Sequence, residues 1–167
     1  MRYSIVIILL FSGMVVTTAE ATGVLGRESL RGLSGIFVVA EELGPNGKTS
    51  GLSAGTIRTA VERILRDNGI QVLTRQEGRT GLSAAILEIT ATPVKSRNRS
   101  AYGINVTGVV IQQVFLRNGS EMNTPAITWG KSHIAVVDSK SVKAQIMENV
   151  EAIAVEFAND FLLVNPP

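Results

Sequence analysis

Two segments of the chain place hydrophobic residues three or four positions apart, which is the spacing of one face of an α-helix. The first follows Ser53, a suitable N-cap, and ends at Asn68 and Gly69, which suit a helix C-terminus. The second follows Asp138 or Ser141, either of which suits an N-cap, and contains no Gly or Pro almost to the chain end. We predict a helix over each segment, the second about 35 Å long and able to cover a whole sheet. Their hydrophobic faces are Ile57, Ala60, Val61, Ile64 and Leu65, and Val142, Ile146, Val150, Ile153, Phe157, Phe161 and Val164.

Five other segments are rich in β-branched and apolar residues, and Gly, Pro, Asn and Ser separate them. These predicted strands are 33–41, 70–74, 85–92, 101–116 and 126–137. The element order is therefore β-α-β-β-β-β-α, which predicts an α+β fold with one five-stranded mixed sheet and two helices packed on one face. The first two strands should be parallel, joined by a right-handed crossover, and the last three should form an antiparallel meander.

The fourth predicted strand is apolar on both sides, which is unusual for a sheet with only one covered face. Ile104 and Val110 share one side, while Val109, Ile111 and Phe115 share the other. Because both helices pack on one face, we expect another copy or a partner protein to cover the second face. The loop over 76–83 could also fold over it, but we favour the first two because this loop is polar. Val109, Ile111 and Phe115 are therefore candidate interface residues. Trp129, in the last strand, is either an interface anchor or a core residue.

The first residues indicate export. Arg2 supplies a positive charge, residues 5–16 form an apolar run, and Ala19-Glu20-Ala21 fits a signal peptidase site. An uncleaved membrane anchor is the alternative, but the run of about a dozen residues is short of the ~20 that cross a bilayer. We therefore expect a signal peptide over 1–21, a lead-in segment over 22–32, and a single α+β domain over 33–167. No transmembrane segment is expected in the mature chain.

Composition narrows the classes of function. The 167 residues carry a formal net charge of +2, which argues against a nucleic-acid-binding protein. The chain has no cysteine, so disulfides, thiolate nucleophiles, cysteine zinc sites and lipidated cysteines are excluded. A cysteine-free exported chain fits a bacterial periplasm or exterior better than a eukaryotic one.

The sequence contains little that suggests catalysis. His133 is the only histidine, it lies in a predicted strand, and no nucleophile, phosphate-binding or metalloprotease motif is present. We interpret it as a structural residue and expect no cofactor, no metal and no enzymatic activity. Lys95, Arg97 and Arg99 cluster in a predicted hairpin loop. They are candidate contacts for anionic lipid, peptidoglycan or an acidic partner, or simply a solubilising hairpin tip.

The order of motifs resembles that of a widespread set of uncharacterised bacterial secreted proteins. The matching stretches are Leu33-Ser34-Gly35-Ile36, Glu62-x-x-Leu65-Arg66-x-x-Gly69-Ile70, Thr128-Trp129 and Phe161-Leu162-x-Val164-Asn165-Pro166. They cover most of the mature chain and are structural rather than catalytic. The predicted topology is also similar to the N-terminal domain of the Tol–Pal propeller protein and to the core of the curli secretion lipoprotein. This resemblance implies a role in binding envelope proteins or forming rings, although the chain lacks the lipidated cysteine of the curli type.

Three functional hypotheses remain. We favour a non-enzymatic periplasmic or secreted module that acts by protein–protein contact, with an envelope protein or a second copy as its partner. A carrier of a small apolar ligand or lipid is the alternative, with its pocket between the sheet and the C-terminal helix near Trp129, Met147 and Phe157. A hydrolase that uses His133 is the third.

We predict that the exported protein is cleaved after Ala21, because a positive residue, an apolar run and an Ala-x-Ala site follow one another in that order. N-terminal sequencing of the exported protein should begin at Thr22. An exported protein that retains Met1 would contradict this prediction.

Overall fold

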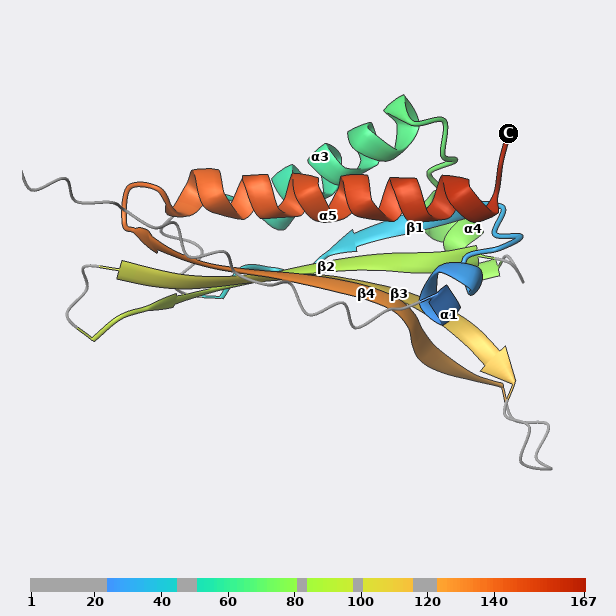
Figure 1. Cartoon of the computed structure of the whole chain (residues 1–167), viewed down its shortest axis with the longest axis horizontal. Helices are drawn as coiled ribbons and strands as arrows, with labels where there is room; N and C mark the ends of the chain where they lie inside the picture. The colour runs from blue at the N-terminus through green and yellow to red at the C-terminus, as the bar shows by residue number, and fades with distance from the viewer. Residues whose placement is uncertain (1–23, 45–50, 81–83, 98–100, 116–122) are drawn as a thin grey trace, which may run out of the picture.

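The computed structural model describes residues 24–44, 51–80, 84–97, 101–115 and 123–167. The fold is α+β, as expected, with a four-stranded mixed sheet in the order β1-β2-β3-β4. The strands are β1 (Gly35–Ala40), β2 (Ala84–Lys95), β3 (Ala101–Phe115) and β4 (Asn123–Asp138). The helices are α1 (Val24–Glu28), α3 (Ala54–Asp67), α4 (Arg75–Thr80) and α5 (Val142–Val164), and α5 lies along the sheet (Figure 1).

The predicted antiparallel meander is confirmed by β2, β3 and β4, but the number of strands is not. The parallel ladder of β1 is with β2, rather than with a strand over 70–74 as predicted. The predicted strand 70–74 is reduced to a parallel bridge between Val72 and Ile36, outside the named strands. The strand cannot extend further, because the chain begins α4 directly afterwards. Thr74 and Glu77 cap this helix, and the Glu77 carboxylate accepts from the Thr74 backbone N–H at 2.8 Å. The sheet therefore has four strands rather than five.

Two short helices replace segments that were expected to be irregular. α4 occupies much of the expected polar loop 76–83, and its Gly78 lies against Phe37 of β1, the register partner of Ile86. α1 falls in the expected lead-in 22–32. The two hydrogen bonds from Thr74 to Glu77, together with the Glu77 N–H donating to the Thr74 hydroxyl at 3.3 Å, form a capping box. The same bonds hold the pKa of Glu77 below its usual range, the backbone N–H contributing most. The Thr74-x-x-Glu77 spacing was a sequence signal for α4.

The predicted helix α3 is confirmed at both ends. The Ser53 hydroxyl accepts from the Thr56 N–H at 3.1 Å, which makes Ser53 the N-cap. At the other end Gly69 has a φ of 75°, a value that favours glycine, and the Ile70 N–H donates back to the Leu65 carbonyl at 2.9 Å. Within the helix, Ile57, Val61 and Leu65 are buried as the periodicity predicted.

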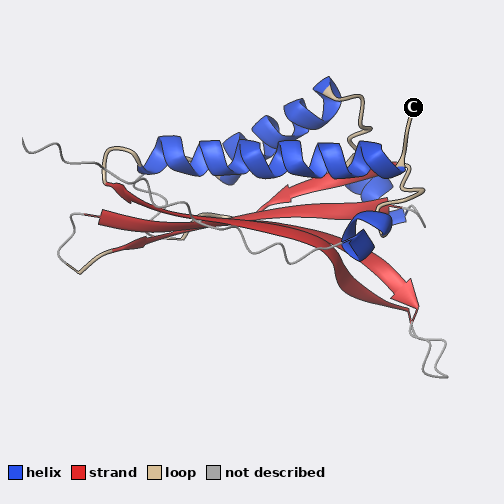
Figure 2. Cartoon of the chain, viewed as in Figure 1, coloured by secondary structure: helices blue, strands red, loops and turns tan. Residues whose placement is uncertain are grey.

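Helix α5 is the main cover of the sheet, and its predicted hydrophobic face is buried along its full length. Figure 2 shows α3 and α5 together on one side of the strands. The helix approaches β3 most closely at Gly108, where a Cβ atom would lie 2.5 Å from Cγ2 of Ile153 and 3.1 Å from Cδ1 of Ile89. Glycine is therefore required at this position to let helix and sheet meet.

The N-terminal segment is fastened to the C-terminal end of α5. The Asn165 side chain donates to the Leu30 carbonyl at 2.9 Å and accepts from the Gly32 N–H at 2.7 Å. Leu30 is fully buried in the core, and Gly32 has a φ of 77°. The expected lead-in is thus part of the packed domain.

We predict that Gly108→Ala destabilises the fold by about 1–3 kcal/mol, because the added methyl group overpacks the contact with Ile153. Gly103→Ala is the matched control on the same strand, since its Cβ would meet no atom within 4 Å. Urea unfolding should give the control a stability equal to that of the parent protein or slightly higher. Equal effects of the two substitutions would contradict the close-approach interpretation.

Candidate functional site

The strands β2, β3 and β4 have one face covered by α5 and an opposite face that is largely open, and the prediction for the sides of β3 is confirmed. Ile104, Val106 and Val110 are buried toward α5. Val109 and Ile111 alternate with them, so they point to the opposite side, which we call the open face.

One end of the open face carries an uncharged apolar cluster. Ile86, Ile111 and Ile127 are register partners across β2, β3 and β4, so the three side chains form one row on one face. Phe115 and Ile127 are 74% and 67% exposed, which is unusual for large apolar side chains that form one group. We call Ile86, Val109, Ile111, Phe115 and Ile127 the Phe115 cluster.

The middle of the open face is polar. Thr90, Thr107 and Ser132 are partners across the three strands, and the hydroxyls of Thr107 and Ser132 lie 3.2 Å apart. The Ser132 hydroxyl donates to the Asn105 side chain at 2.8 Å. Glu88 on β2 separates this band from the isoleucine row. The Phe115 cluster is therefore limited to one end of the open face, and polar residues separate it from the rest of that face.

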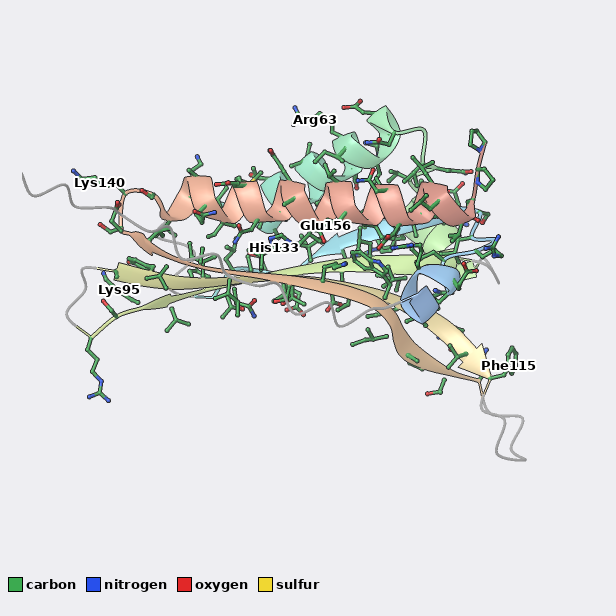
Figure 3. All side chains as sticks on the ribbon, viewed as in Figure 1. Arg63, Lys95, Phe115, His133, Lys140 and Glu156 are labelled. Carbon is green, nitrogen blue, oxygen red and sulfur yellow. The ribbon has the colours of Figure 1, made fainter. Side chains whose placement is uncertain are left out.

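The far end of the open face is apolar, and the basic Lys95 at this end of the sheet lies on the covered side with Tyr102. Val94 and Val136 are 59% and 77% exposed and flank Gly103, which has open space above its Cα, and Ile134 beside them is 61% exposed. The predicted basic hairpin begins here. Lys95 lies over the Tyr102 ring at 5.5 Å and Arg97 is exposed, whereas Arg99 lies outside the described residues. Figure 3 shows Lys95 and Lys140 at one end of the molecule and Phe115 at the other.

Asp138 supplies negative charge at this basic end. Its carboxylate accepts from the backbone N–H groups of Lys140 and Ser141, at 2.7 and 3.0 Å, and from the Ser141 hydroxyl. These bonds hold the pKa of Asp138 below its usual range, and the backbone N–H groups of Lys140 and Ser141 contribute most. Asp138 thus organises the turn before α5, while the first turn of α5 receives no side-chain cap from Ser141.

Strand β4 is an edge strand, but its edge is guarded in three ways. Pro125 lies within it, the ladder with β3 is irregular at Val110 and Ile111, and Lys131 points inward with 13% of its side chain exposed. Each of these features discourages another strand from pairing with the edge. The open face, rather than the edge, is therefore the candidate contact surface.

His133, singled out in the sequence as the only histidine, lies on the covered side instead. His133 pairs with Glu156 of α5, with 2.9 Å between Nε2 and Oε1, and Lys131 approaches the same carboxylate at 3.8 Å. Ser132, the neighbouring hydroxyl, points to the open face and is bonded there to Asn105. This arrangement links β4 to α5. It does not place the Ser132 hydroxyl beside His133, as a catalytic serine–histidine pair would require.

The interface alternative for Trp129 is wrong. Its side chain is 0% exposed and meets the Phe157 ring edge-on, with centroids 5.2 Å apart. Its indole N–H donates to Oδ2 of Asp160 at 3.0 Å, and Oδ1 of Asp160 accepts from Arg27 at 2.8 Å. Trp129 is therefore a core residue. Its indole N–H is bonded to Asp160 of α5, which also forms an ion pair with Arg27 of α1.

The space expected for a carried ligand is filled by side chains. Trp129 and Phe157 are both fully buried and in contact between the sheet and α5. A hollow of 620 Å³ lies instead beside α3, where its lining includes Arg63, Met147 and Glu151. Among the described residues, no group of three or more acidic or histidine side chains is placed to hold a metal ion. None of the described helices is both long and apolar enough to cross a membrane.

Comparison with known proteins gives only distant structural likenesses. No family model and no curated protein matches the chain. A PelC dodecamer from Paraburkholderia phytofirmans matches at 15% identity and a TM-score of 0.49, over 83% of this chain and 95% of that one. A minor lipoprotein from Acinetobacter baumannii matches at 11% identity and a TM-score of 0.35, over 80% and 94%.

A putative lipoprotein from Caulobacter crescentus CB15 matches at 19% identity and a TM-score of 0.29, over 83% of this chain and 90% of that one. None of these three is a Tol–Pal propeller protein or a curli lipoprotein, so that resemblance stays a prediction. At such low TM-scores the likenesses carry no argument about the function of this chain.

We predict that Asp160→Ala costs about 1–3 kcal/mol, because it leaves the buried indole N–H of Trp129 without an acceptor. Asp160→Asn keeps an acceptor and should cost less. His133→Ala should cost below about 1 kcal/mol, since its partner Glu156 is partly exposed and returns to solvent. Thermal unfolding of the three variants checks this order, and a larger loss for His133→Ala would contradict it.

Proposed function

We propose that this chain is a non-enzymatic module of the bacterial envelope, periplasmic or secreted, that acts by protein–protein contact through the Phe115 cluster. The observation that carries the proposal is the exposure of Phe115 and Ile127 beside a row of isoleucines that spans three strands. Soluble monomers rarely leave a contiguous apolar patch of this kind in water. The location rests on the export signal read in the first residues.

A second copy of the chain is the partner that this cluster fits best. The row Ile86–Ile111–Ile127 contains no charged residue, so two copies can meet there without placing like charges together. A two-fold interface uses the same patch on both subunits, and such a patch must be complementary to itself. Ile111 is the middle residue of the row, so a two-fold pairing of rows brings Ile111 against its own counterpart.

Charge also selects the orientation of the pair. If the strands of the two copies run in opposite directions, the basic ends that carry Lys95 and Lys140 point away from each other. If the strands of the two copies ran in the same direction, the two basic ends would lie together and repel each other. A standard interface buries about 800 Å² on each partner, so the Phe115 cluster would form its centre and the Thr and Asn side chains of the polar band its rim.

We predict that Ile111→Lys weakens self-association at least about tenfold, because it places a buried charge at the centre of the interface. Folding should be affected less, since this side chain is only partly covered in the free chain. Sedimentation velocity gives the association constant, and thermal unfolding gives the stability.

Thr107→Lys is the matched control, because Thr107 lies on the same strand and face but within the polar band. It should leave association nearly unchanged. The proposal fails if the wild-type protein stays monomeric across accessible concentrations. It also fails if Ile111→Lys associates as strongly as the wild type, or if Ile111→Lys unfolds while the more exposed Ile127→Lys folds and associates normally.

A further inference from the structure

Strand β1 forms the second edge of the sheet, and it lacks the guards that β4 carries. It pairs with β2 on one side over its whole length, and it contains no proline and no charged residue. On its other side, the only segment among the described residues that bonds to it is 71–73, which reaches Ile36 and is followed by α4. The place of the predicted strand 70–74 is therefore only partly filled, and the rest of the β1 edge can accept another strand.

Val38 and Ala40 present the backbone groups that an added strand would bond. The N–H and C=O groups of Ile36 are bonded to the segment 71–73, whereas the Glu41 N–H donates to β2 at 3.0 Å. Successive residues of a strand direct their N–H and C=O groups to opposite sides, so Val38 and Ala40 direct theirs away from β2, as Ile36 does. None of the described residues forms a hydrogen bond with these four groups.

A hollow of 250 Å³ lies along this part of the edge. Residues 37–40 of β1 line one side of it, and the first turn of α3 and Arg75 of α4 line the others. In Figure 1, α3 begins near the arrowhead of β1, and α4 lies toward the other end of the strand. The free backbone groups of β1 are therefore open to an extended segment that enters between the two helices.

The charges beside the hollow favour an acidic segment. Arg58 and Arg75 line it, together with a single carboxylate, that of Glu42. Arg58 approaches Glu62 only to 3.6 Å, and the same carboxylate lies 2.9 Å from Arg66. Arg75 forms no ion pair with any carboxylate in the part of the chain that the structure describes. Both guanidinium groups can therefore bind carboxylates of an added peptide.

A second copy of the chain fits this edge poorly. Two β1 edges placed side by side would bring Arg58 and Arg75 of one copy against the same residues of the other, and like charges repel. The other edge strand, β4, is guarded by Pro125 and by the inward-pointing Lys131. The added strand must therefore come from a different protein.

We propose that the β1 edge binds an extended acidic peptide of a partner protein by strand addition. The peptide backbone bonds to Val38 and Ala40, and the peptide carboxylates meet Arg58 and Arg75. In strand addition, main-chain hydrogen bonds supply affinity and the side chains supply specificity. This site is separate from the Phe115 cluster, whose residues lie on β2, β3 and β4.

Titration of the mature protein with a synthetic peptide in which valine and glutamate alternate tests the proposal, with amide hydrogen exchange as the readout. In the free protein the Val38 and Ala40 amides should exchange fast, and saturating peptide should slow them at least about tenfold. The Val39 amide should change little, because the ladder with β2 already protects it. A peptide in which valine and lysine alternate has the same propensity for an extended backbone but the opposite charge, and it should bind more weakly.

Arg58→Glu/Arg75→Glu should weaken binding of the glutamate peptide at least about tenfold, because two ion pairs are replaced by repulsion. The matched control is Arg63→Glu/Lys143→Glu, which changes the net charge equally at exposed positions outside the hollow and should retain the binding. Thermal unfolding checks that both double variants fold.

The proposal is overturned if the glutamate peptide does not bind, if the lysine peptide binds equally well, or if the two double variants lose binding equally. Protection on the open face instead of at Val38 and Ala40 would also overturn it. The association-deficient Ile111→Lys variant should bind the glutamate peptide as the wild type does, which keeps this result separate from self-association.

Discussion

The contact between α5 and the middle of β3 determines the rest of the structure. At Gly108 the missing side chain lets Ile153 sit directly on the sheet, and the long apolar face of α5 then covers three strands. Because α3 packs on the same side, the hydrophobic residues of that side form one continuous core. On the other side, α4 packs on Phe37 of β1, the register partner of Ile86, while the apolar residues of β3 and β4 point away from α5, and the Phe115 cluster follows from this one-sided packing.

Polar contacts then fix how α5 lies on the sheet. Near its C-terminal end, Asp160 joins Trp129 of β4 to Arg27 of α1, and Asn165 holds the segment that contains Leu30. One turn earlier, Glu156 accepts contacts from His133 and Lys131 of β4. Both carboxylates contact side chains of the edge strand β4, so they orient the helix on the sheet.

The sequence predicted what local periodicity determines. The spacing of Ile57, Val61 and Leu65 located α3, and the alternation along β3 placed Ile111 on the face away from the helices. Periodicity did not predict that 70–74 is too short for a strand, because the segment ends in the capping box of Thr74 and Glu77, which begins α4. The position of Trp129 depended on long-range packing against Phe157 and Asp160, which no local pattern contains.

The candidate surfaces were predictable only in part. Alternation identified Val109, Ile111 and Phe115, but their isoleucine partners on β2 and β4 became visible only with the strand register. The register also separated the Phe115 cluster from Val94, Ile134 and Val136 at the other end of the open face. Lys140 and Lys95 are far apart in the sequence but lie at the same end of the molecule, because the turn that Asp138 organises follows the end of β4.

Because the chain contains no cysteine, a single introduced thiol reports directly on the central claim, which is that two copies pair through the isoleucine row. The measurement is the fraction of disulfide-linked dimer that forms under mild oxidation at a concentration where the wild type is associated. Ile111→Cys should cross-link efficiently, since this position meets its own counterpart, whereas Thr92→Cys in the polar part of the open face should remain monomeric. Equal cross-linking of the two variants, or none with Ile111→Cys in an associated sample, would contradict the account.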